Sequence, residues 1–240
     1  MFNRKGRPRV GDEAQPSAEQ PEEAAEAPPE EQPAADRSAG PFDITEVADT
    51  ADYLDLGALL VRPVPGVSIR LDQDPQTRQV VAVTVVRGSQ SMQLRAFAAP
   101  RSGGMWEDNR AAVKEQLEEG GNRVEEAEST FGTELRAIVA VPQQAGPPVT
   151  RTVRFVGVEG PRWLLHAVFT AEGGRHPTWD DLEAVLGGVV VVRGEQAVPA
   201  GGMLMLRIPA EAASAAEGRP AEQGPDVESL EPGPHITEVR

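Results

Sequence analysis

The fold of this chain is constrained most by a series of short segments in which apolar and polar residues alternate. Val67, Ile69 and Leu71 alternate with polar neighbours, Val80–Arg87 is rich in β-branched residues, and Met92–Ala98 alternates again. A period of two places one set of side chains on each face of an extended strand. Because turn-forming residues separate these segments, they predict three strands of an antiparallel meander.

Three further strand-like segments follow at Glu134–Val141, Arg151–Val158 and Arg162–Thr170. The turn Glu159-Gly160-Pro161 joins the last two segments. Glycine adopts positive φ without steric strain, and proline lacks the N–H that a central strand requires. The sequence therefore predicts a tight hairpin in which Gly160 takes the positive φ.

Two helices are predicted between the groups of strands. The first lies between two glycine pairs, Gly103-Gly104 and Gly120-Gly121, which are typical of helix ends. The second follows Thr178, a candidate N-cap, and ends at Gly187-Gly188. The last predicted strands are Val189–Arg193 and Met203–Ile208. This order of elements indicates an α+β fold, a largely antiparallel sheet with two main helices packed on it.

The two ends of the chain differ in composition from its middle. Residues 1–41 and 211–240 are rich in acids and proline and poor in large apolar side chains. Such segments bury too little apolar surface to offset the entropy of ordering a chain. We therefore expect a single α+β domain over residues 42–210, a disordered acidic arm over 1–41 and a disordered acidic tail over 211–240.

Several kinds of site have no counterpart in the sequence. Its 240 residues include no cysteine, which excludes disulfides, thiol nucleophiles and cysteine-ligated metals. The three histidines lack zinc-binding spacing and no glycine-rich phosphate-binding motif occurs, so we expect no metal and no cofactor. The net charge of −15 argues against direct contact with nucleic acid. No apolar run approaches the roughly 20 residues of a membrane span, so we expect a soluble cytoplasmic protein that does not bind membranes.

Arg154, Arg162 and Trp163 of the predicted hairpin are the candidate binding residues. Arginine and tryptophan are enriched at interaction hot spots, and an arginine over an aromatic ring can hold an acidic group. A plainer interpretation keeps Trp163 in the core and both arginines in solvent. In an alternative, Arg95, Arg154, Arg162 and His166 surround a cleft for a nucleotide or another phosphorylated metabolite. Arginine binds phosphate through two parallel hydrogen bonds, and neutral histidine can act as a base.

A short motif occurs twice in the chain. Gly40-Pro41-Phe42-Asp43-Ile44-Thr45-Glu46-Val47 recurs, one residue shorter, as Gly233-Pro234-His235-Ile236-Thr237-Glu238-Val239. Ile-Thr-Glu-Val favours a strand, and the second copy follows a segment that is expected to be disordered. We therefore predict that Ile236, Thr237, Glu238 and Val239 form a short linear motif, which adds as an edge strand to a partner or to the domain itself.

Several stretches resemble a known family: Asp55–Val61, Leu94–Pro100, Trp106 with its helix, Arg154–Trp163, Val191–Gly194 and Ile236–Arg240. They are similar to an actinobacterial family, domain of unknown function 3710, and the similarity covers about residue 40 to the end. The resemblance implies a cytoplasmic protein. It also implies a gene that is often near those of a dUTPase and a small OB-fold protein, but it implies no activity and no catalytic residue.

These observations predict an uncharacterised intracellular protein that acts as a non-enzymatic protein-binding or adaptor module, with an unidentified protein partner and no catalytic residue. The alternative is an enzyme or binder that acts on a nucleotide or another phosphorylated metabolite through the Arg/His cleft. A third interpretation, an accessory factor in nucleic-acid metabolism, depends only on the gene neighbourhood that the resemblance implies, and it requires a protein intermediary because the chain is acidic.

Overall fold

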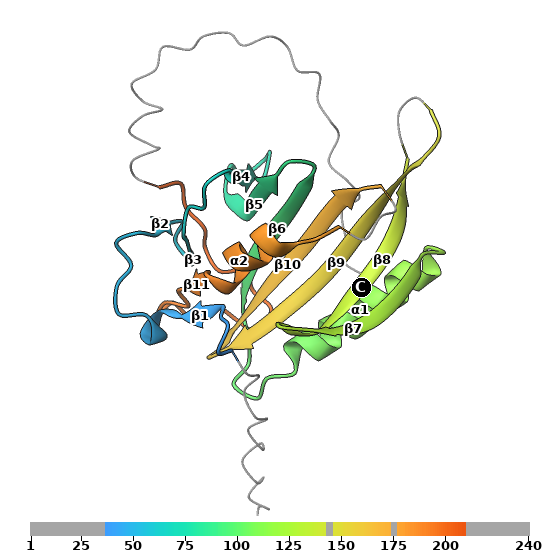
Figure 1. The fold of residues 1–240 in the computed structure, drawn as a ribbon. Helices are drawn as coiled ribbons and strands as arrows, with labels where there is room; N and C mark the ends of the chain where they lie inside the picture. Colours follow the sequence, from blue (N-terminus) through green and yellow to red (C-terminus); the bar gives the residue numbers. More distant parts are fainter. Residues whose placement is uncertain (1–36, 143–145, 174–176, 210–240) are drawn as a thin grey trace, which may run out of the picture. The chain divides into compact units, whose positions relative to one another are not determined.

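A seven-stranded sheet runs through the computed structural model, which describes residues 37–142, 146–173 and 177–209 (Figure 1). All of its strand pairs are antiparallel. In spatial order its strands are β4 (Ser68–Gln73), β5 (Val80–Arg87), β6 (Gln90–Ala98), β10 (Trp163–Glu172), β9 (Val149–Gly160), β8 (Gly132–Val141) and β7 (Arg123–Ser129). The predicted meander is β4–β5–β6, and the predicted hairpin is β9–β10.

A second, smaller sheet has four short strands and includes the one parallel pair within the described residues, β1 with β11. In spatial order its strands are β1 (Phe42–Asp43), β11 (Val190–Val191), β3 (Leu59–Val61) and β2 (Leu54–Asp55). A short 3-10 helix, η1 (Ile44–Glu46), follows β1. The predicted strand at 189–193 is therefore only two residues long, and it belongs to this second sheet.

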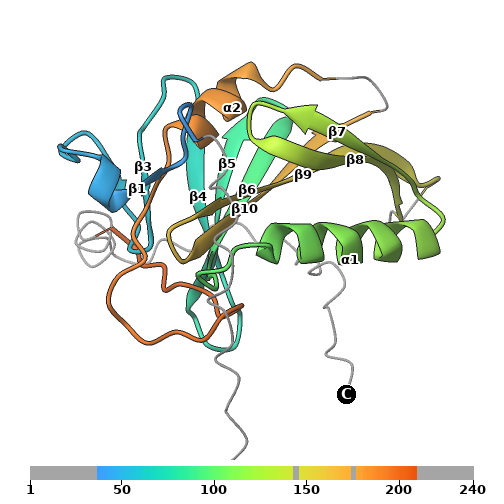
Figure 2. The same cartoon turned by 90° about the horizontal axis from the view of Figure 1, so that it is seen from below.

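Two α-helices occur in the described ranges, and they lie on opposite faces of the large sheet (Figure 2). Helix α1 (Met105–Glu119) lies against β7, β8 and β9. Helix α2 (Asp180–Gly187) and the small sheet cover the other face, where the main core includes Trp163, Phe169, Leu182 and Leu186. The α+β class is confirmed. None of the described helices is long and apolar enough to cross a membrane.

Helix α1 is held by a close fit between Trp106 and β9. A Cβ atom on Gly157 would lie 2.1 Å from Cδ2 of Trp106, so glycine leaves the space that the indole ring occupies. The indole Nε1 donates a hydrogen bond to the Thr133 carbonyl at 2.8 Å. The Glu159 carboxylate accepts hydrogen bonds from the backbone N–H groups of Gly104 and Trp106. A side chain from the sheet therefore caps the helix, which satisfies donors that have no intrahelical partner.

The turn of the β9–β10 hairpin differs from the prediction. Gly160 is the last residue of β9 and pairs with Trp163, so the turn consists of Pro161 and Arg162. The positive φ belongs to Arg162, at 63°, and not to Gly160. Gly160 is required for a different reason, because a Cβ there would lie 2.1 Å from Cζ2 of Trp163.

Two other local predictions were wrong, and one strand was missed. Met203–Ile208 is not a strand, because its residues make only isolated bridges to Gly57, Val80 and Phe97. Thr178 is not the N-cap of α2, since that position falls on Trp179 and no side-chain hydrogen bond caps the helix there. Strand β7 had no counterpart in the prediction, because its sequence, RVEEAES, is mostly polar.

Candidate binding cleft

A cleft of about 420 Å³ lies between the start of α2 and the outer strands β7, β8 and β9. Side chains on one face of these strands form its floor, and the strand register arranges them in rows. Glu125, Arg136 and Arg154 form one row across the three strands, and Arg123, Ile138 and Thr152 form the next row. Pro177, Trp179 and Glu183 complete the wall at the α2 side.

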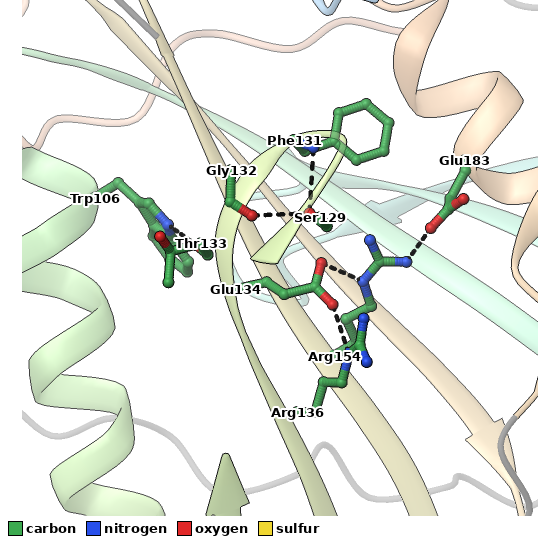
Figure 3. A network of polar contacts seen from close by, with 9 residues as sticks. All are labelled: Trp106, Ser129, Phe131, Gly132, Thr133, Glu134, Arg136, Arg154 and Glu183. Atoms are coloured by element: carbon green, nitrogen blue, oxygen red, sulfur yellow. Dashed lines mark hydrogen bonds and ion pairs between the residues drawn. The ribbon is translucent and has the colours of Figure 1, made fainter. Parts of the chain in front are cut away.

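An ion-pair network joins the floor of the cleft to α2 (Figure 3). Arg154 Nε donates to Glu134 Oε2 at 2.6 Å, and Arg136 Nε donates to Glu134 Oε1 at 2.7 Å. Arg154 Nη1 donates to Glu183 of α2. The Glu134 side chain is fully buried and that of Arg154 is 4% exposed. A buried ion requires an opposite charge and hydrogen bonds to offset its lost hydration, and this network supplies both.

Aromatic rings hold the same guanidinium from the core side. Cζ of Arg154 lies 5.0 Å from the ring centroid of Phe169, and the Trp179 ring meets Phe169 edge to face at 5.3 Å. A cation over a ring face is attracted by the ring quadrupole. Arg154 is therefore fixed in position by two carboxylates and an aromatic ring, and the floor of the cleft is rigid.

The rim of the cleft is accessible and mixed in character. Ile138 is 46% exposed, which makes it one of the few exposed large apolar residues in the described chain. Arg123, Glu125 and Arg136 around it are exposed charged residues. An apolar centre within a charged rim is the usual anatomy of a protein interaction surface.

The three hairpin residues singled out from the sequence lie in different surroundings. Arg154 is at the floor of the cleft. Trp163 is fully buried, and its Nε1 donates to Asp43 Oδ2 at 2.7 Å. Arg162 is exposed at the turn and lines a second pocket of about 930 Å³ near the start of α1. The motif residues Ile236, Thr237, Glu238 and Val239 lie outside the described residues.

The proposed cluster of Arg95, Arg154, Arg162 and His166 does not converge. His166 pairs with Arg95 on β6 and Gly157 on β9, on the face that carries α1, whereas Arg154 pairs with Phe169 and faces the other way. The physical reason is the two-residue turn, which pairs even-numbered positions of β9 with odd-numbered positions of β10. The Arg/His cleft of the alternative is therefore not formed.

His166 packs against aromatic side chains. Its ring lies between Trp106 and Phe155, with centroid separations of 5.6 and 6.3 Å. Its Nε2 is buried and has no hydrogen-bond partner among the described residues. Burial, with a smaller contribution from the charge of Arg95, lowers the pKa of His166 from 6.5 to about 4. The imidazole is therefore neutral at neutral pH.

The second pocket contains several cations, but neighbouring acids already neutralise much of its charge. Arg101, Arg110 and Arg162 line it, together with the first turn of α1. Arg110 lies 3.8 Å from a carboxylate oxygen of Glu126. The N-terminal N–H groups of α1, which would otherwise attract an anion, are occupied by the Glu159 carboxylate. An anionic ligand would have to displace that carboxylate.

The first copy of the repeated motif is part of the fold. Phe42 and Asp43 form β1, and Asp43 then caps η1 by accepting a hydrogen bond from Thr45 N at 3.0 Å. Hydrogen bonds from Thr45 and Trp163 lower the pKa of Asp43 and outweigh the opposing effect of burial, which is the largest single contribution. In the second copy His235 takes the position of Asp43, so that copy lacks the capping carboxylate.

Of the residues that line the cleft, sequence reasoning singled out Arg154 alone and missed the others, Ile138, Trp179 and Glu183 among them. It also missed Glu134, which binds Arg154. Glu134 carried no usable signal, because a charged residue that alternates with the apolar Leu135 is expected on the solvent face of its strand. Its partner in β9 depends on register, which the sequence does not show. Within the described ranges no group of three or more His, Asp or Glu side chains is placed to hold a metal ion.

Comparison with known proteins identifies one family. Residues 40–215 match the model of a family described as "Protein of unknown function (DUF3710)". No curated protein matches the chain. A crystal structure of a protein from Bacteroides thetaiotaomicron VPI-5482 is similar at 12% identity and a TM-score of 0.35, over 59% of this chain and 48% of that one. The chain thus spans about half the length of that protein.

Proposed function

We propose that this chain, which belongs to the DUF3710 family of proteins of unknown function, is a non-enzymatic module. It binds a protein partner in the cleft beside α2. One observation carries the proposal. An exposed isoleucine, Ile138, lies beside the charged Arg123 and Arg136 in the lining of the cleft, which also includes Glu125 and Trp179, next to an arginine that buried ion pairs hold in position.

The residue types and their rigidity favour a protein partner. Arginine and tryptophan are the side chains that most often carry binding energy at protein interfaces. Binding to a surface that is already ordered avoids the entropy of immobilising side chains. Arg154 is ordered before any partner arrives, because Glu134 and Glu183 hold it. The partner contributes apolar contact to Ile138 and opposite charges to the rim.

A phosphorylated metabolite is less well supported. Phosphate recognition requires cations whose hydrogen-bond donors are available to the ligand. In the cleft, Arg154 and Arg136 share the carboxylate of Glu134, and Arg154 also binds Glu183. A phosphate at Arg136 or Arg154 would have to compete with carboxylates that are already in place.

The adaptor part of the proposal assigns a second contact to the tail. Ile236, Thr237, Glu238 and Val239 act as a linear motif for another partner, so the protein joins two others in the cytoplasm. The first copy of the motif differs from the strand expected from the sequence, because its Ile44–Glu46 form the 3-10 helix η1 and only Phe42 and Asp43 before them pair with β11. The strand-forming role of the second copy therefore depends on its partner supplying the sheet edge.

A capture experiment tests both contacts. The full chain is used as bait in lysate of its native host, beside Ile138→Asp and a version without residues 233–240. Ile208→Asp is the matched control, since Ile208 is 42% exposed but does not line the cleft. We expect Ile138→Asp to lose one partner and the truncated chain to lose another. Equal capture of every partner by Ile138→Asp and the unaltered chain would refute the proposal that a partner binds in the cleft.

A further inference from the structure

Strand β7 forms one edge of the large sheet and has a single strand neighbour, β8. Within the described chain no backbone hydrogen bond joins its outer side to another strand. An edge strand presents a row of unpaired N–H and C=O groups, which makes it a template for another strand. The sequence of β7 indicates which strand would fit.

We infer that the fitting strand is β7 of a second copy of the same chain, paired antiparallel about a two-fold axis at Val124. In that register Arg123 faces Glu125 of the second copy and Glu125 faces Arg123 of the second copy. The two Val124 residues face each other at the axis. A two-fold interface requires a surface that is complementary to itself, and Arg123-Val124-Glu125 has this property.

Neighbouring registers lack this complementarity. An axis at Glu125 places the two Glu125 carboxylates directly opposite each other. An axis at Glu126 places the two Glu126 carboxylates opposite each other, and it removes the partner of Arg123. Like charges in directly opposite positions destabilise a strand pair, whereas opposite charges stabilise it. The charges of β7 therefore select the register centred on Val124.

The backbone has the correct phase for this register. The two-residue turn Thr130-Phe131 closes the β7–β8 hairpin, so the closing pair Ser129 and Gly132 is hydrogen-bonded. Hydrogen-bonded and non-bonded pairs alternate along an antiparallel ladder. Counting back along β7, the N–H and C=O of Val124 point away from β8. They are free to bond the same groups of the second copy.

The side chains have room for the new pairs. Arg123 and Glu125 both line the cleft and are exposed, and neither takes part in an ion pair within the described residues. Glu126, on the other face, is held by Lys114 of α1, so α1 stays with its own copy. The two strands overlap over residues 123–125, because the residues that face 126–129 of the second copy are the end of α1 and the turn after it. The clefts of both copies lie on the same face and adjacent to the axis.

Sedimentation equilibrium on the full chain tests the dimer. Each single reversal, Arg123→Glu or Glu125→Arg, converts both cross-strand pairs into like charges. We expect each to raise the dimer dissociation constant about tenfold or more. The double reversal restores both pairs in swapped positions and returns the constant to within about threefold of the original. Arg70→Glu, an exposed arginine on the opposite edge strand β4, is the control and leaves the constant unchanged.

Three results overturn the inference. The first is a monomeric unaltered chain at the highest soluble concentration. The second is a dimer that persists in both single reversals, which would place the interface elsewhere. The third is a double reversal that fails to recover while its thermal unfolding matches that of the unaltered chain. Arg123 and Glu125 also line the proposed partner site, but the sedimentation sample contains no partner, so its outcome does not depend on that proposal.

Discussion

Replacement of Arg154 by leucine tests whether the buried ion pair stabilises the fold as the structure implies. The substitution removes a guanidinium that is 4% exposed and leaves Glu134, fully buried, with a single partner. That partner, Arg136, has a side chain that is 46% exposed, so water competes for it. Glu183 is 35% exposed and regains hydration when Arg154 is lost.

The expected loss is set by the buried carboxylate. Removing one partner of a buried pair costs about 3–5 kcal/mol, because the other charge is left without compensation. Since Arg136 continues to bind Glu134, we expect the lower end, about 3 kcal/mol. For a domain of this size that loss corresponds to a fall in Tm of roughly 10 °C. The pair Arg207–Asp55 is the contrast, because both side chains are more than half exposed and its loss costs about 0.5 kcal/mol.

Urea unfolding followed by tryptophan fluorescence measures both losses. The variants are Arg154→Leu, Arg207→Leu and the double variant Glu134→Leu/Arg154→Leu. The double variant removes both buried charges, and we expect it to recover most of the lost free energy of unfolding. A loss for Arg154→Leu no larger than that for Arg207→Leu would refute the reasoning. So would a double variant that is less stable than Arg154→Leu.

Three further predictions concern α1 and the sheet beneath it. Below pH 6.5 the unfolded chain protonates His166, whereas the folded chain does so only near pH 4, so the stability falls as the pH is lowered. Relative to His166→Leu, urea titrations show an extra loss of about 2 kcal/mol on going from pH 7 to pH 5. Gly157→Ala forces a Cβ into the Trp106 ring and lowers stability by about 1–3 kcal/mol, measured by thermal unfolding, whereas an unchanged Tm contradicts the fit. Glu159→Ala removes the cap of α1 and costs about 1 kcal/mol, with faster amide exchange in the first helical turn; exchange equal to that of the unaltered chain argues against capping.

Local patterns identified most of the elements. Glycine pairs bounded the first predicted helix, and α1 runs over Met105–Glu119 between them, because glycine ends a helix without tertiary help. Alternation located β4 and β6 for a similar reason, since a strand with one buried face needs apolar residues at every second position, and a run of β-branched residues located β5.

Two segments show where local patterns mislead. Strand β7 is at the edge, with α1 on one face and an open cleft on the other, so its strand structure needs few apolar residues. Met203–Ile208 is the reverse case, because the alternation is present but the strand is not. Leu204 and Leu206 are buried and Met203 and Met205 exposed, as in a strand, but the backbone makes only isolated bridges. Alternation of apolar and polar residues indicates which side chains are buried. It does not show that the backbone pairs with a neighbouring strand.

The sequence by itself determined the positions of both helices and of most strands of the large sheet, the absence of thiol chemistry and the fold class, because each depends on composition or on residues a few positions apart. Only the tertiary structure decided the cleft. It placed Glu134, Arg154 and Glu183 together from β8, β9 and α2, and it turned His166 to the opposite face. Strand register and the packing of layers decide which side chains come into contact, and both arise from interactions between residues that are far apart in the chain.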